Sequence, residues 1–485
     1  MNEAIHGLKP EAIWKYFSEI SAIPRCSKNE KNVLDYIKKT ATSLGLKWKQ
    51  DKVGNVVVTK PPTQGRENSP TVVLQVHVDM VCEKNRDVQH DFTRDPIKFH
   101  REGNYIKANG TTLGADDGIG VASLLAILED SSLVHGPIEG LFTVDEETGL
   151  TGANHIEPGF ITGEIMMNLD SEDEGVLYIG CAGGLDSTLT IPLKKKPVTG
   201  KTATLAVKVR GLKGGHSGVD IHLGRANAIK LLTRTLLAIE DRVKIKLGSL
   251  EGGSKHNAIP REAEAVIVVT PSDVEKVYQS ASQSESDFKA AFGSVDPDIK
   301  VSVEQTGKVR QVIDDNSKKK ILNCLNALPH GVIRMSSDIP DLVETSTNLA
   351  VVKTGRNSVD IITSQRSSIE SEKNMIASQV ASVANLCGAK VRVSNGYPGW
   401  KPNVNSAILS KGKEVYRNLF GNDPAVKAIH AGLECGIIND RVGGKVDTIS
   451  FGPTIIGPHS PDEQVDIQSV EKFWMFLTEL LKAVA

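Results

Sequence analysis

The chain has 485 residues, a formal net charge of −2, and 39% hydrophobic and 24% charged residues. Its length predicts two or three domains, and its composition is typical of a soluble globular protein. A charge so close to zero gives no electrostatic case for binding nucleic acid or an anionic membrane. No apolar stretch reaches the roughly 18 residues that a transmembrane helix needs.

The amino terminus and the cysteines both favour the cytoplasm. The first residues lack the basic region, apolar core and cleavage site of a secretory signal, so we do not expect secretion by that route. Six cysteines, at positions 26, 82, 181, 324, 387 and 435, are scattered without a paired short spacing. We therefore expect reduced thiols in the cytosol.

Residues 1–186 alternate helices with strands and predict the first part of a doubly wound α/β domain. Amphipathic or apolar patterns predict helices at 10–21, 32–44 and 119–128. Short apolar runs bounded by glycine or polar turns predict buried strands of a central, mostly parallel sheet, at 74–78, 141–144 and 165–169.

Residues 187–396 read as an inserted α+β domain, because strands and helices suggest a sheet with helices on one side. The expected strands lie near 203–209, 263–269, 348–352 and 358–363, and the expected helices near 225–239, 272–292, 317–328 and 368–385. Residues 397–485 then return to the first domain, with a helix at 406–419, a strand at 425–429 and a helix at 467–481.

Five residues that bind hard or borderline metals follow or lie within apolar runs: His77, Asp116, Glu147, Asp170 and His459. Several fall near the carboxyl ends of predicted strands, the edge where open α/β sheets bind ligands. A single such residue is more often a cap or a turn former. Two imidazoles and three carboxylates together are enough for two metal ions that share one carboxylate, so we expect a hydrolytic metalloenzyme.

Spacing assigns two further carboxylates. Asp79 shares a strand face with His77, where it can accept a hydrogen bond from the metal-binding imidazole. Glu146 and Glu147 are adjacent and would face opposite sides of a strand, so Thr148-Gly149 must supply a turn. We assign Glu147 to a metal and Glu146 to taking a proton from a bridging water.

Together with four further segments, these motifs resemble the co-catalytic zinc peptidase superfamily of aminoacylases, glutamate carboxypeptidases and tripeptidases, and most closely its Xaa-His dipeptidases. The resemblance covers nearly the whole chain. It implies a catalytic domain formed by 1–186 and 397–485, a lid at 187–396 and a homodimer formed through that lid. The further segments are 214–220, 256–262, 396–400 and 430–436.

The resemblance implies a role for each candidate. His77 and Asp170 would bind one Zn²⁺, Glu147 and His459 the other, and Asp116 would bridge them. Asp79 and Glu146 would form the catalytic pair, and the peptide bond after Asp116 would be cis. Carboxylate-rich sites also accept Mn²⁺ or Co²⁺, so another divalent ion stays open. One departure is Gly118, where many relatives have Lys, and it removes no ligand.

Three lid residues are candidates for contacting substrate. In relatives, the histidine of a Gly-His-Ser motif reaches an active site from the lid, often across a dimer interface, so His216 would help to stabilise an oxyanion. Asn257 and Arg366 would hold substrate, the latter through the affinity of its guanidinium for a carboxylate. Whether His216 serves its own or the partner's site stays open.

The expected reaction is hydrolysis of unblocked dipeptides, including Xaa-His and β-alanyl-histidine. The preference for histidine rests on the resemblance alone. A related tripeptidase or N-acyl-amino-acid deacylase would use the same metal residues, and a non-catalytic binding protein on a peptidase fold is a further alternative.

Overall fold

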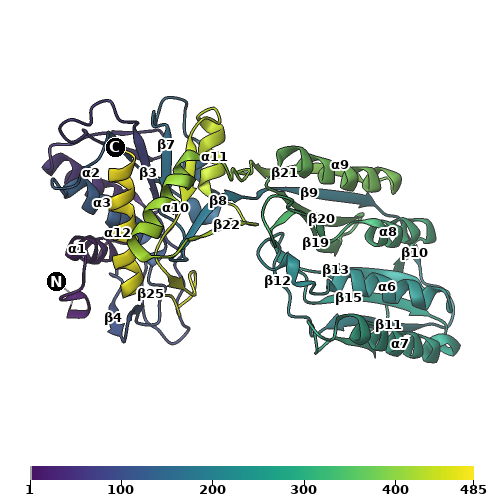
Figure 1. Ribbon diagram of the computed structural model, residues 1–485. Helices are drawn as coiled ribbons and strands as arrows, with labels where there is room; N and C mark the ends of the chain where they lie inside the picture. Colours follow the sequence, from purple (N-terminus) through teal and green to yellow (C-terminus); the bar gives the residue numbers. More distant parts are fainter. Residues whose placement is uncertain (1–2) are drawn as a thin grey trace. The chain divides into compact units, whose positions relative to one another are not determined.

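A computed structural model describes residues 3–485 (Figure 1). The chain divides into two compact units. The first unit contains the residues up to Cys181, Trp400–Ala428 and Leu433–Ala485, so it is built from both ends of the chain. The second unit contains Ala182–Gly399 and Ile429–Gly432.

The first unit is built on an eight-stranded mixed sheet in the order β1-β2-β6-β3-β7-β23-β8-β22. Its centre, β6-β3-β7-β23, is parallel, whereas β1, β2 and β8 pair antiparallel with their neighbours. Every residue of β3 and β6 is buried, as expected of parallel strands covered on both faces. The strands are β1 (Lys47–Gln50), β2 (Val56–Lys60), β3 (Val72–His77), β6 (Ile138–Thr143), β7 (Ile165–Asn168), β8 (Val176–Cys181), β22 (Ala425–Ile429) and β23 (Asp447–Ser450).

Helices pack against this sheet and against one another. Helix α3 is buried along all but its last residue because it lies between α1 and strands β3 and β6. It begins at Ala115, before the predicted start at residue 119. The helices of this unit are η1 (Glu3–Ile5), α1 (Glu11–Ser21), α2 (Lys31–Ser43), α3 (Ala115–Glu129), α4 (Glu146–Gly149), α5 (Thr151–Asn154), α10 (Ala407–Phe420), α11 (Glu434–Arg441) and α12 (Ile467–Ala483).

A smaller four-stranded sheet completes the first unit. Its order is β24-β25-β5-β4, so strands from the two ends of the chain pair with one another. The loop between β24 and β25 carries His459. The strands are β4 (Phe99–Glu102), β5 (Tyr105–Ala108), β24 (Ile455–Ile456) and β25 (Gln464–Asp466).

The second unit has a nine-stranded sheet in the order β16-β11-β15-β13-β19-β20-β9-β21, with β18 also paired to β19. Its neighbouring strands run antiparallel. The strands are β9 (Gly183–Pro192), β11 (Ala203–Arg210), β13 (Lys246–Gly252), β15 (Ala263–Val269), β16 (Lys300–Gln305), β18 (Gly331–Met335), β19 (Val343–Thr354), β20 (Ser358–Ser367) and β21 (Lys390–Tyr397). Two short pairs are β10 (Lys195–Pro197) with β17 (Gln311–Ile313), and β12 (Gly215–His216) with β14 (Ala258–Ile259).

Four long helices form one layer on this sheet (Figure 1). Helix α6 contacts β11, β13 and β15, and α9 contacts β9, β20 and β21. Because α6 also contacts α7 and α8, and α8 contacts α9, the layer is continuous and encloses one apolar core. The predicted α+β arrangement is confirmed. The helices are α6 (Ala228–Glu240), α7 (Val274–Phe292), α8 (Asp315–Ala327) and α9 (Glu370–Leu386), with short turns η2 (Ile221–Leu223) and η3 (Pro271–Asp273).

The structure corrects one expectation about the cysteines. Cys26 and Cys82 form a disulfide, with their Cα atoms 5.7 Å apart, although all six were expected to be reduced. The two segments meet because Cys26 pairs with Met80 in a parallel bridge just beyond β3. A separation of 56 residues hid this approach from the sequence.

Two further backbone features bear on the predictions. The Asp116–Asp117 peptide bond is cis, as the resemblance implied. Residues 429–432 belong to the second unit, where the amide of Ala182 donates to the carbonyls of Ile429 and Ala431.

None of the helices in residues 3–485 combines the length and apolar character that a membrane crossing requires.

The second unit offers a matched test of its core. Leu232 of α6 is fully buried, whereas Leu386 at the end of α9 is 88% exposed. Leu232→Ala should lower the free energy of unfolding of this unit by about 2–5 kcal/mol because it leaves a cavity, and Leu386→Ala should change it by less than about 0.5 kcal/mol. Denaturant unfolding and hydrogen exchange of α6 check both. Equal effects would contradict the packing described.

Candidate metal centre

The five candidate ligands come from loops and element ends that meet at one edge of the eight-stranded sheet. His77 ends β3, and Asp170 follows β7, its parallel neighbour. Carboxyl ends of parallel neighbours meet at the same edge, so these side chains lie close together. Asp116 lies in the first turn of α3, Glu147 in α4 directly after β6, and His459 in the β24–β25 loop.

The ligand atoms form two groups of three that share Asp116. His77 Nε2 lies 3.1 Å from Asp116 Oδ1 and 3.2 Å from Asp170 Oδ1. His459 Nε2 lies 3.1 Å from Asp116 Oδ2 and 3.0 Å from Glu147 Oε2. Asp116 therefore turns one oxygen to each group.

This arrangement fits two ions of the size of zinc. Ligand atoms about 2.0–2.1 Å from a tetrahedral ion lie roughly 3.4 Å from one another, slightly more than the separations found here. Glu147 Oε1 is buried and has no hydrogen-bond partner among the described residues, as a ligand atom of a metal would lack one. Carboxylate and imidazole donors suit zinc and also manganese or cobalt.

Buried carboxylates give the centre an excess of negative charge. Burial, reinforced by neighbouring carboxylates, raises the pKa of Asp170 to about 7 and that of Glu172 to about 8. It also raises the pKa of Glu434 to about 8, although a hydrogen bond from Thr143 opposes the shift. Burial and neighbouring carboxylates thus disfavour the ionised forms of these groups, an effect that divalent ions would oppose.

The pKa shifts of the two histidines and of Asp116 favour the charged forms of these groups. Burial alone would lower the pKa of His77, but Asp170, Asp116 and Asp79 raise it well above its usual value. Hydrogen bonds to Asp116 and Glu147 raise the pKa of His459 to about 11. The same two histidines outweigh burial and lower the pKa of Asp116.

Asp79 links the strand of His77 to the turn of the glutamates. Its carboxylate accepts hydrogen bonds from the Ser27 hydroxyl at 2.8 Å and from the amides of Glu146 and Glu147 at 3.0 and 3.2 Å. His77 Nδ1 lies 3.3 Å from Asp79 Oδ1 without the alignment of a hydrogen bond. Asp79 thus fixes the backbone of Glu146 and Glu147 and lies beside the imidazole.

Glu146 lies beside the candidate ligands. One of its carboxylate oxygens groups with His77 and Glu147 in a third cluster of close donor atoms. Burial raises its pKa well above the usual value, and nearby carboxylates add to this effect while His77 opposes it. A raised pKa makes the ionised carboxylate a stronger base.

The predicted lid residues His216, Asn257 and Arg366 lie in the second unit. His216 Nδ1 accepts hydrogen bonds from the amides of Gly218 and Val219, at 3.3 and 3.1 Å, so the proton of the neutral ring is on Nε2. Burial, with Arg366 nearby, lowers its pKa to about 4. The backbone carbonyl of Asn257 accepts from the Ser217 amide at 2.8 Å, which ties it to the same turn.

Arg366 lies among polar groups that the sequence did not single out. Its Nη1 donates to the Tyr397 hydroxyl at 3.0 Å, and its Nε is buried without a hydrogen-bond partner among the described residues. His430 Nε2 lies 2.7 Å from Ser346 Oγ, and burial, again with Arg366 nearby, lowers its pKa to about 3. Only its presence in the resembling segment 430–436 could have drawn attention to His430.

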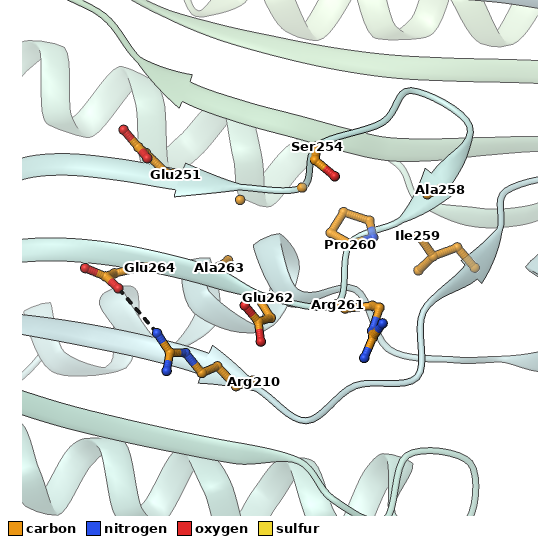
Figure 2. Close-up of a pocket in the computed structure, with 12 residues that line it drawn as sticks. Arg210, Glu251, Ser254, Ala258, Ile259, Pro260, Arg261, Glu262, Ala263 and Glu264 are labelled. Atoms are coloured by element: carbon orange, nitrogen blue, oxygen red, sulfur yellow. Dashed lines mark ion pairs between the residues drawn. The ribbon is translucent and has the colours of Figure 1, made fainter. Parts of the chain in front are cut away.

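One cavity of the second unit is lined by other residues. It measures about 580 Å³ and is lined by Arg210 together with residues 251–254 and 258–264 (Figure 2). Arg210 pairs with Glu264 at 3.9 Å across it. No candidate ligand lines it, so this cavity is not the metal centre.

Three comparisons relate the chain to known proteins. The peptidase dimerisation domain matches residues 207–294. A cytosol non-specific dipeptidase from Escherichia coli (strain K12) is 42% identical over 477 residues, which cover 98% of each chain. The crystal structure of an aminoacylhistidine dipeptidase from Vibrio alginolyticus is similar with a TM-score of 0.91 and 42% identity, covering 99% of this chain and 98% of that one. Aminopeptidase PepT from Bacillus cereus shares the fold, with a TM-score of 0.57 and 16% identity over 98% of this chain and 99% of that chain.

The excess carboxylate charge should make the metal-free protein sensitive to pH. A glutamate in an unfolded chain titrates near pH 4.3, whereas Glu172 has a pKa of about 8. Between these values the folded state binds its proton more tightly, so stability falls as pH rises. Glu172→Gln should therefore lose less stability than the wild type between about pH 5 and about pH 8.

The thermal unfolding midpoint of chelator-treated protein, followed against pH, checks this prediction. Glu157→Gln is the matched control, because the Glu157 side chain is 70% exposed. It should lose stability with pH as the wild type does. Identical slopes for the Glu172 variant and the wild type would show that the pKa of Glu172 is not raised in the folded state.

Proposed function

Because the chain belongs to the M20 family of metallopeptidases, and is thus a hydrolase of peptide bonds, we propose that it is a di-zinc dipeptidase acting on unblocked dipeptides. The observation that carries this proposal is the pair of ligand groups that share Asp116, with Glu146 beside them. His77, Asp170 and Asp116 would hold one ion, and Asp116, Glu147 and His459 the other.

Two bound zinc ions would polarise the scissile carbonyl and lower the pKa of water at the centre, and Mn²⁺ or Co²⁺ could substitute. The remaining work falls to the protein. The Glu146 carboxylate would take a proton from the attacking water and deliver it to the leaving amine. Its place beside His77 and Glu147 supports this role, because a proton acceptor must lie within reach of the attacking water.

Asp79 would position the Glu146–Glu147 turn as well as the imidazole of His77. Its carboxylate accepts hydrogen bonds from the backbone amides of Glu146 and Glu147. These bonds would orient the proposed base Glu146 together with the candidate ligand Glu147. Asp79 also lies beside the ring nitrogen of His77 that faces away from the ligand group. A carboxylate in that place supports the orientation and the basicity of a ligating imidazole.

The lid residues would contact the reacting carbonyl group and the carboxylate of the substrate. Neutral His216 offers its Nε2 proton as a hydrogen-bond donor to a developing oxyanion. Arg366 would bind the substrate carboxylate through its guanidinium, and Asn257 would hold substrate beside it. His430, whose ring lies near Arg366, is a further candidate in the same cluster.

The substrate class draws on the two similar dipeptidases. One is named non-specific and the other aminoacylhistidine dipeptidase. We propose that this chain cleaves Xaa-His dipeptides, including β-alanyl-histidine, within a wider set of unblocked dipeptides. Cytosolic location follows the name of the Escherichia coli relative, and a homodimer formed through residues 187–396 follows the matched dimerisation domain.

A substrate panel tests the reaction. We expect the zinc-loaded protein to cleave Xaa-His and other unblocked dipeptides, and not a tripeptide or N-acyl amino acids. Glu146→Gln should lower kcat by about 10²–10⁴-fold and retain both ions, because it removes the base and no ligand. Steady-state kinetics and metal analysis provide the measurement, with exposed Glu157→Gln as the control of unchanged activity.

The panel also separates the alternatives. Activity confined to acylated substrates or to tripeptides would assign the chain to a related deacylase or tripeptidase. Tight zinc binding without turnover of any substrate would favour a binding protein. Full activity in Glu146→Gln would remove Glu146 from the reaction.

Two lid substitutions should separate turnover from binding. His216→Ala should lower kcat by about 10²–10³-fold, as expected when one oxyanion donor is lost. Arg366→Lys should mainly raise KM, because a single ammonium replaces a guanidinium that can bind a carboxylate twice. Both variants should keep the metal content, because every described metal group lies in the first unit.

The pH dependence of His216→Ala is informative because His216 has a pKa of about 4. Its ring stays neutral from about pH 5.5 to about pH 8, so the ratio of wild-type to variant kcat should stay constant over that range. A ratio that changes steeply near pH 6.5 would mean that His216 acts as a titrating acid or base instead.

A further inference from the structure

Glu463 binds the backbone that leads to Asp116, although it supplies no ligand atom. It lies four residues after His459 and its side chain is 2% exposed. Its Oε2 accepts the amides of Leu113 and Gly114 at 2.7 and 2.9 Å. Its Oε1 accepts the amides of Ala115 and Asp116 at 2.7 and 3.3 Å. One carboxylate thus satisfies four consecutive amides at the start of α3, where helical amides otherwise lack acceptors.

Arg25 binds the carbonyls of the same region. Its guanidinium is 2% exposed and donates from Nη1 to the carbonyls of Val78 and Asp79, at 3.0 and 2.9 Å. Its Nη2 donates to the carbonyl of Gly114. Arg25 therefore joins the residues that follow His77 to the loop that Glu463 holds through its amides.

Two glycines make room for this guanidinium. A Cβ atom added at Gly114 would lie 2.7 Å from Arg25 Nη2, and one added at Gly118 would lie 2.6 Å from it. Gly114 also has a positive φ of 69°, which favours glycine. The side chain missing at Gly118 thus leaves space that Arg25 fills.

We propose that Glu463 and Arg25 are positioning residues that hold the Asp116 loop, the end of β3 and the His459 loop in the arrangement needed for metal binding before any ion is bound. The inference rests on the proposed metal function. Neither residue belongs to a group of possible ligands among residues 3–485. The folded protein would then already hold the candidate ligand carboxylates close together, so metal binding would need less reorganisation of these loops. Residues next to metal ligands play this part in other metal sites.

Hydrogen exchange of the metal-free protein tests the holding role directly. Glu463→Gln leaves an amide nitrogen facing backbone donors, so half of the acceptor capacity is lost. We expect the amides of residues 113–116 to be protected in the wild type and to exchange at least tenfold faster in Glu463→Gln. Unchanged protection would overturn the proposal.

Glu139→Gln is the matched control. Glu139 is 7% exposed in the same unit, and its Oε2 accepts the amides of Thr162 and Gly163 at 2.7 and 3.1 Å. It is therefore a buried glutamate that binds backbone amides away from the candidate ligands. Its variant should leave the exchange of residues 113–116 as in the wild type. Equal loss of protection in both variants would mean general loosening of the fold and would overturn the proposal.

Cobalt titration, followed by its visible absorption, tests the consequence for metal binding. Glu463→Gln and Arg25→Lys should bind Co²⁺ about 10–100-fold more weakly, and Glu139→Gln should bind it as the wild type does. Unchanged affinity in both site variants would overturn the proposal. If Glu463→Gln fails to fold, Arg25→Lys carries both comparisons, because lysine keeps the charge and loses the forked donor geometry.

The two measurements keep this inference distinct from the proposed function. If the wild type takes up no metal, the proposed function fails, and the exchange of residues 113–116 still decides whether Glu463 and Arg25 hold the loop. If the wild type binds metal and neither variant alters exchange or affinity, the positioning role fails and the proposed function stands.

Discussion

Buried negative charge at the carboxyl edge of the parallel strands is the constraint on which the rest of the first unit depends. Asp116, Asp170 and Glu147 approach one another closely enough that their repulsion must be offset. The protein offers His77 and His459 and a buried arginine, yet Asp170 still has a pKa of about 7. The offset is incomplete in the protein alone, which is the physical reason that divalent cations suit the site.

Backbone dipoles supply the other part of the compensation. Backbone amides at the start of α3 donate hydrogen bonds to Glu463. Backbone amides of the turn after β6 donate hydrogen bonds to Asp79. Each of these carboxylates therefore holds a loop through hydrogen bonds from backbone amides, whereas Oε1 of the candidate ligand Glu147 has no hydrogen-bond partner among the described residues.

The connectivity of the chain lets one compact unit be built from its two ends. Cys181 and Trp400 exchange two backbone hydrogen bonds of 2.9 Å where the chain leaves the first unit and returns to it. The second unit is inserted at this point without interrupting the central sheet. It differs chemically from the first, because His216 and His430 are kept neutral by burial near Arg366.

Local pattern was enough to predict most elements and to single out the candidate ligands that the fold brings together. The strands at 263–269 and 425–429 were predicted with the bounds that the structure has, because apolar runs and turn residues act over a few positions. Only tertiary structure decided which groups meet. Glu463 and Leu113 are 350 residues apart, Cys26 pairs with Cys82, and His430 contacts Ser346, and no local period marks such pairs. Periodicity reports which face of an element is buried, whereas hydrogen bonds and charge compensation depend on the folded approach of segments distant in sequence.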